Sequence, residues 1–176
     1  GMMGDRGAHT MDSIVTSLKL GPPLSIDATS SDLNPDTHPV ASVITFQFAA
    51  RENLPPVKLT WYEGTRSPRP VDLEDGRKLR ADGGAIFKGS KGTLVCGVYG
   101  ESPRLIPEKR MQEFQRPEKT LPRFTVSHEM HWVECCKSGR PANADFSYAG
   151  PLTELCLLGN VAKRVDTRIE WDAAAM

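Results

Sequence analysis

The sequence predicts an α+β fold: an open, mostly antiparallel β-sheet with helices packed on one face. Segments with the period-two alternation of half-buried strands fill the middle of the chain, and segments with helical spacing lie at its start and in its last third. The resulting order is helix, several strands, two helices and a final strand. Because strands and helices do not alternate strictly, a doubly wound parallel sheet is not expected.

The first elements are a helix and three strands. Residues 12–18 carry an apolar stripe made by Ile14, Val15 and Leu18, and the Gly21-Pro22-Pro23 sequence ends this helix. Strands are predicted where polar and apolar residues alternate, at residues 24–30, 43–48 and 57–62. The second strand is expected to have two faces, one of which the helices cover. One face carries Ile44, Phe46 and Phe48, and the other carries Val43, Thr45 and Gln47.

The next part of the chain is irregular and basic. Residues 64–84 contain few apolar side chains and carry Arg66, Arg69, Arg77, Lys78 and Arg80. They are interpreted either as a solvated loop or as a site for an anionic substrate or a cofactor phosphate. Two strands follow at 85–88 and 93–99, joined by a hairpin turn with a glycine at each end, and a short helix is expected at 107–114.

The last third contains two predicted helices. Ser127 can cap a helix that runs through Cys136, and Pro151 suits the first position of a second helix that runs to about Arg164. A final strand is expected at residues 168–171.

Composition narrows the class of protein. The 176 residues fit one domain, and 22 basic residues balance 22 acidic ones, so no overall field attracts nucleic acid or an anionic membrane. No apolar run is long enough to span a bilayer, and the first residues lack the apolar segment of a signal peptide. The four cysteines, Cys96, Cys135, Cys136 and Cys156, are read as free thiols, which favours the cytoplasm.

A carboxylate–histidine constellation lies near the start of the chain. Asp5 precedes His9 by four residues and Asp12 follows it by three, so His9 and Asp12 share a helix face, and Gly7 would let Asp5 fold back towards the imidazole. A carboxylate beside an imidazole fixes its tautomer and favours its protonated form, as an acid/base catalyst requires. By spacing alone, the preferred interpretation is that His9 is a polar residue near a helix terminus and Asp12 a helix cap.

This segment, Gly4-Asp5-Arg6-Gly7-Ala8-His9-Thr10-Met11-Asp12, resembles the G-D-x-G-x-H-x-x-D stretch that opens the C-terminal domain of Gfo/Idh/MocA family oxidoreductases. Further runs, spread over nearly the whole chain, are similar to a bacterial branch of that family: 56–62, 83–89, 100–107, 150–154 and 158–160.

The resemblance implies a function for the whole protein. Family members combine an N-terminal Rossmann domain, which binds NAD or NADP, with a C-terminal domain that holds a sugar, polyol or related small molecule. Residues 1–176 would be the C-terminal substrate-binding and oligomerisation domain, with no cofactor expected in this chain, which has neither a G-x-G-x-x-G turn nor the family's E-K-P segment. The isolated domain is therefore not expected to be a competent enzyme.

The resemblance also assigns residues and partners. Asp5 and His9 would be the catalytic pair, and Asp12 and Tyr62 would contact the substrate. The partners would be the missing Rossmann domain, the carbohydrate-like substrate and a second copy bound through the sheet, with neither nucleic acid nor a membrane among them. Two other functions remain open: an NAD-dependent glycosidase of the same superfamily, and a non-catalytic binding or oligomerisation module.

A metal site on the penultimate helix is the last candidate. His128, His131 and Cys135 are spaced to share one face, but Trp132 occupies the place of the second histidine of H-E-x-x-H. Packing of the helix is therefore the preferred interpretation, and no metal is assigned.

Overall fold

The computed structural model describes residues 1–64, 73–74, 77, 79 and 81–175. Their helices and strands follow in the order α1 Met2–Leu18, β1 Ser25–Ser30, β2 Ser42–Phe48, β3 Val57–Glu63, β4 Ala85–Gly89, β5 Gly92–Cys96, β6 Arg104–Ile106, α2 Glu108–Glu113, α3 His128–Ser138, α4 Phe146–Val165 and β7 Ile169–Glu170. A single 3-10 turn, Ala173–Ala175, follows β7. Within these residues no helix is long and apolar enough to cross a membrane.

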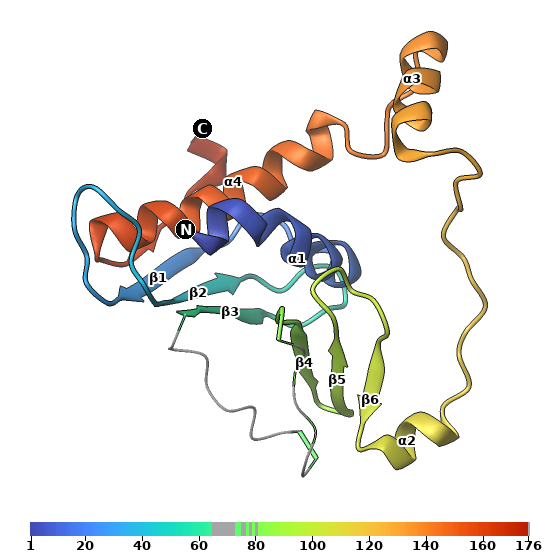
Figure 1. The fold of residues 1–176 in the computed structure, drawn as a ribbon, viewed down its shortest axis with the longest axis horizontal. Coiled ribbons are helices and arrows are strands. Elements are labelled where there is room, and N and C mark those ends of the chain that lie inside the picture. Colours follow the sequence, from blue (N-terminus) through green and yellow to red (C-terminus); the bar gives the residue numbers. More distant parts are fainter. Residues whose placement is uncertain (65–72, 75–76, 78, 80, 176) are drawn as a thin grey trace.

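The larger sheet has the order β3-β2-β1-β7 and is antiparallel throughout. Helices α1 and α4 pack against each other and cover one of its faces (Figure 1). The predicted fold class is therefore confirmed. The observed strands differ from the predicted ones by only a residue or two in β1, β2 and β3.

The core lies between this sheet and its two helices. Along β2 every second side chain is buried, among them Ile44, Phe46 and Phe48, as the alternation predicts. Phe46 lies opposite Ile26 of β1 and Leu59 of β3, so one apolar row crosses three strands. The helices add a second layer of fully buried side chains, namely Met3, Met11 and Ala162. Burial of each large apolar side chain stabilises the fold by roughly 1.5–3 kcal/mol.

Glycine allows α1 and α4 to approach closely. A Cβ added to Gly7 would lie 2.9 Å from Met3 Sδ and 3.0 Å from Cys156 Sγ, and one added to Gly159 would lie 3.1 Å from Phe46 Cζ. The expectation that Gly7 lets Asp5 fold back in a turn is wrong, because α1 runs unbroken from Met2 through Gly7. This glycine serves the contact between two helices and not a bend in the chain.

A second, three-stranded sheet has the order β4-β5-β6 and lies beside α1 (Figure 1). The strand predicted over 93–99 ends at Cys96, because a tight turn joins Gly97 to Gly100 through a backbone hydrogen bond of 3.0 Å. Strand β6 was not predicted, since its three residues are too few to show alternation.

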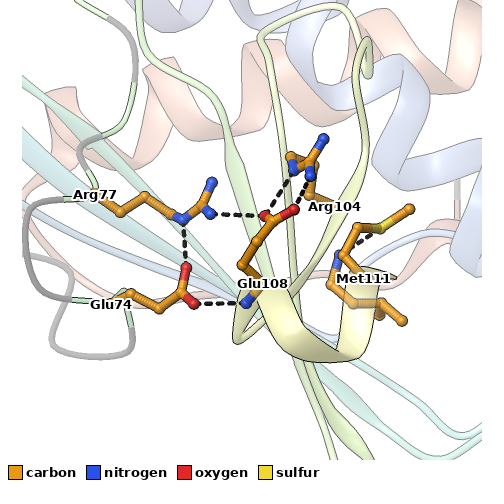
Figure 2. Close-up of polar contacts among 6 residues, drawn as sticks. Glu74, Arg77, Arg104, Glu108 and Met111 are labelled. Carbon is orange, nitrogen blue, oxygen red and sulfur yellow. Dashed lines mark hydrogen bonds and ion pairs between the residues drawn. The ribbon is translucent and has the colours of Figure 1, made fainter. Parts of the chain in front are cut away.

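A cluster of ion pairs joins this sheet to the chain that precedes it (Figure 2). Arg77 binds Glu74 at 2.8 Å and Glu108 at 2.9 Å, while Arg104 binds the same Glu108 carboxylate. The Glu108 amide donates to Glu74 and holds the pKa of that carboxyl below its ordinary value. The charge of Arg77 is thus neutralised by carboxylates, which makes this residue less suited to bind an anionic substrate.

The other basic residues of the irregular segment, namely Arg66, Arg69, Lys78 and Arg80, lie outside the described residues, so the interpretation of that segment as an anion site stays a prediction.

The helices of the last third begin at their capping residues. The Ser127 hydroxyl accepts a hydrogen bond from the Met130 amide, as predicted, and α3 runs on to Ser138. Helix α4 begins earlier than predicted, at Phe146, because Asp145 caps it by accepting a hydrogen bond from the Ser147 amide. Pro151 therefore lies inside α4 and not at its first position.

One buried ion pair connects both helices to the sheet. Lys163 Nζ of α4 lies 2.8 Å from Glu63 Oε1 at the end of β3, and the two side chains are 1% and 4% exposed. The Glu63 carboxylate also accepts hydrogen bonds from the Ser42 hydroxyl at 2.7 Å, the Met3 amide at 3.1 Å and the Trp61 indole at 3.2 Å. Four donor groups, one each from α1, α4, β2 and β3, therefore meet at this carboxylate.

Replacing one partner of this pair should destabilise the protein strongly. In Glu63→Gln the ammonium group of Lys163 stays buried without its counter-charge, so we expect the free energy of unfolding to fall by about 3–5 kcal/mol. Urea denaturation measures the change. The matched control is Glu52→Gln, whose partner Lys19 forms an exposed ion pair, and its effect should stay below about 1 kcal/mol. Equal effects of the two substitutions would contradict the role assigned to Glu63.

The same carboxylate should make stability depend on pH. Burial raises the pKa of Glu63, but hydrogen bonds from Lys163 and Ser42 outweigh burial and hold the pKa below its ordinary value of 4.5. A depressed folded-state pKa means that this stabilisation is complete above the unfolded-state pKa and is lost as the pH falls through the folded-state value. We expect the free energy of unfolding to fall more steeply below about pH 5 in the wild type than in Glu63→Gln. Parallel curves in urea unfolding at a series of pH values would contradict this.

Candidate functional site

The outward face of α1 carries the three residues singled out near the start of the chain. Asp5, His9 and Asp12 are all exposed, and their helical spacing places them along one stripe, opposite the face that buries Met3, Gly7 and Met11. Among the described residues no hydrogen bond joins Asp5 to His9. The structure therefore brings the three residues to one surface with the imidazole open to a ligand.

Tyr99 completes this surface from the second sheet. The ring centroids of His9 and Tyr99 lie 5.7 Å apart at an interplanar angle of 75°, an edge-to-face contact. Arg6 Nη2 of the same helix donates a hydrogen bond of 3.5 Å to the Tyr99 hydroxyl. The sequence pattern predicts a strand through Tyr99 and does not indicate that this residue lies beside His9. The pair of glycines on either side of Tyr99, Gly97 and Gly100, is the sequence signal that could have predicted a turn there.

Asp12 is tied to the start of α4. The Tyr148 hydroxyl donates a hydrogen bond to Asp12 Oδ1 and lies 2.8 Å from the Thr16 hydroxyl. Burial raises the pKa of Tyr148, and the hydrogen bond to the Asp12 carboxylate raises it further. One oxygen of Asp12 is thus engaged within the protein, and the role of Asp12 in substrate binding stays a prediction.

Tyr62, the other predicted substrate contact, lies elsewhere. It pairs with Val43 across β3 and β2, and both side chains point away from the face that α1 and α4 cover. Its neighbours Trp61 and Glu63 point to the covered face, where their side chains hydrogen-bond. Within this chain the structure does not bring Tyr62 to His9.

The residues weighed as metal ligands pack against neighbouring groups. The His131 ring lies 4.3 Å from the ring of Phe124, and His131 Nε2 lies 3.6 Å from Cys135 Sγ. No group of three or more potential ligands suited to a metal ion occurs in the described part of the chain. All four cysteines are free thiols, and burial raises the pKa of Cys156 to about 11 and that of Cys96 above its usual range. The thiols of Cys96 and Cys156 are therefore poor nucleophiles at neutral pH.

Comparisons with known proteins extend this description. No protein-family model matches the sequence, and no curated protein matches it. Among solved structures, the chain is similar to an NAD-binding protein from Listeria innocua, with TM-score 0.57 and 15% identity. It is also similar to a "putative dehydrogenase" from Bordetella bronchiseptica RB50, with TM-score 0.54 and 15% identity. These likenesses show that the chain shares its fold with part of each of these two proteins.

Both matches cover a much larger share of this chain than of the matched protein. They cover 97% of this chain, but only 51% of the Listeria protein and 55% of the Bordetella protein. The chain thus spans about half the length of the structures that it matches.

The contact between Asp12 and Tyr148 can be tested by titration. In a variant with Tyr62→Phe and Tyr99→Phe, Tyr148 is the last of the three tyrosines, and we expect its pKa to lie above 10.0. Adding Asp12→Asn removes the carboxylate charge, so the pKa should fall towards the ordinary value because the anionic phenolate is no longer repelled. Near-ultraviolet absorbance follows the phenol. Asp5→Asn is the control on the same helix, and a similar change with Asp5→Asn would refute the assignment.

Proposed function

We propose that this chain is the substrate-side domain of an NAD(P)-dependent oxidoreductase of the Gfo/Idh/MocA family, acting on a sugar, polyol or related small molecule. The observation that carries the proposal is the exposed stripe of Asp5, His9 and Asp12 on α1, where the sequence resembles the family's G-D-x-G-x-H-x-x-D stretch. The shared fold supports it, since the proteins with this fold include one that is named for NAD binding.

The other half of the protein would supply the cofactor site. The sequence contains no G-x-G-x-x-G stretch, so we expect the dinucleotide to bind to the other half of the protein. The matched structures are about twice as long as this chain, which supports an additional Rossmann domain in the parent. Residues 1–176 would then contribute the groups that hold the substrate alcohol.

His9 is the group best placed to handle the alcohol proton. Oxidation of a secondary alcohol to a ketone removes the hydroxyl proton, and an imidazole titrates close to neutral pH, so it can accept that proton. The ring of His9 faces solvent on α1 and carries no hydrogen bond to Asp5 that would hide it. The Asp5 carboxylate, one turn earlier on the same face, would accept a hydrogen bond from the imidazole once a substrate and the second domain close over the helix.

Self-association is the second part of the proposal. Helices cover one face of the larger sheet, and the opposite face presents Val43, Thr45, Gln47 and Tyr62. A second copy that packs its own sheet on this face would give an isologous dimer. Tyr62 would then lie in the interface between the two copies.

The test uses the longer polypeptide that this proposal implies, in which a dinucleotide-binding domain would precede this chain. We expect it to oxidise one or more members of a panel of sugars and polyols while reducing NAD or NADP. His9→Ala should lower kcat by about 10²–10⁴ with no change in cofactor affinity, since it removes the base and no cofactor contact. Stopped-flow nicotinamide fluorescence measures both quantities.

The controls separate this proposal from its alternatives. His128→Ala removes an exposed histidine of α3 and should leave kcat and KM unchanged. The isolated chain should bind neither NADH nor NADPH in calorimetry. Cleavage of aryl glycosides in place of alcohol oxidation would show a glycosidase, and a longer polypeptide that binds no dinucleotide would overturn the proposal in favour of a binding module.

A further inference from the structure

The loop between β5 and β6, residues 97–103, holds Tyr99 against α1. The Gly97 amide donates to the Glu101 carbonyl at 2.9 Å, and the Gly100 amide donates to the Gly97 carbonyl at 3.0 Å. The Tyr99 amide itself donates to the carboxylate Oε2 of Glu101 at 2.9 Å. Three hydrogen bonds within five residues therefore restrain the backbone at Tyr99.

Two glycines allow this loop to pack closely against α1. Gly100 has φ +73°, and a Cβ added to it would lie 2.8 Å from Ser13 Cβ, so only glycine lets the loop lie this close to the helix. A Cβ on Gly97 would lie 2.0 Å from Glu101 Oε1, so the carboxylate fills the space that a larger residue would take. The loop is shaped around the helix turn that contains His9 and Ser13.

Burial does not explain why Tyr99 is held there. Its side chain is 60% exposed, so the apolar area that it removes from water is small. Its contacts are instead the edge-to-face contact with the His9 ring and the hydrogen bond that it accepts from Arg6. Because Arg6 occupies an acceptor position on the phenol oxygen, the O–H proton of Tyr99 remains available to an oxygen atom of a ligand beside His9.

We propose that Tyr99 is a positioning residue for His9, restricting the orientation of the imidazole on the open face of α1. This inference rests on the proposed function, in which His9 receives the alcohol proton. An exposed histidine on a helix otherwise samples several rotamers, and each misdirected rotamer is unable to reach the substrate. The Tyr99 ring occupies space that some of these His9 rotamers would need, and so it excludes them.

Nuclear magnetic resonance of this chain tests the inference without any activity. The aromatic ring of Tyr99 shifts the His9 ring protons, whose signals are identified by their loss in His9→Ala. Tyr99→Ala should move these signals and sharpen them, because the ring current and the restraint both disappear. Tyr99→Phe keeps the ring and should leave them in place. Trp132→Ala, an exposed aromatic residue of α3, is the control, and the other three histidines report whether each variant is folded.

Kinetics of the longer polypeptide supply the second measurement. Tyr99→Ala should lower kcat about tenfold, the value of one aromatic contact, while Tyr99→Phe retains kcat within about twofold. His9 signals that do not respond to Tyr99→Ala would overturn the inference, as would Tyr99→Phe matching Tyr99→Ala. If the polypeptide is not an oxidoreductase, the His9 signals still decide whether Tyr99 positions the imidazole, so the two failures are distinguishable.

Discussion

The buried ion pair between Lys163 and Glu63 is the constraint on which the rest of the fold depends. Glu63 ends the strand at one edge of the larger sheet, Lys163 belongs to α4, and the same carboxylate binds the Met3 amide near the start of α1. An isolated charge in this place would be strongly unfavourable, so the two helices and the sheet are stable only in the arrangement that brings the partners together. The pair thus fixes where α1 begins and how it lies on the sheet.

Helix α1 transmits this constraint to the candidate site. Its inner face packs Met3, Gly7 and Met11 against α4 and the sheet, and its outer face presents Asp5 and His9. Because a helix is rigid over four turns, the position of His9 follows from the packing of residues on the opposite side. The Tyr148 contact to Asp12 and the Tyr99 loop add restraints at the outer face. Helix α1 therefore belongs both to the packed core and to the candidate site.

Local sequence patterns predict the structure where neighbouring residues determine it. Alternation along β2 predicts which side chains are buried, and Ser127 predicts the start of α3, because each signal depends on neighbouring residues alone. Such patterns fail where residues distant in the sequence determine the structure. Gly7 was interpreted as a turn because nothing in the local sequence reveals Cys156 packed above it, and the partner of Glu63 lies a hundred residues away. Tyr99 was missed because its role arises only when the second sheet meets α1.

The contact at Gly7 also restricts how this protein can evolve. Residue 7 and residue 156 share one small volume between α1 and α4, so a larger side chain at position 7 demands a smaller one at position 156. A side chain larger than cysteine at position 156 has no such compensation, because residue 7 is already glycine. Because His9 stands only two residues beyond Gly7, any displacement of the helix that relieves such crowding also moves the imidazole. Changes that alter the candidate site are therefore expected to arise in the loop that carries Tyr99 rather than in the helix interface, which must stay constant while the outer surface varies.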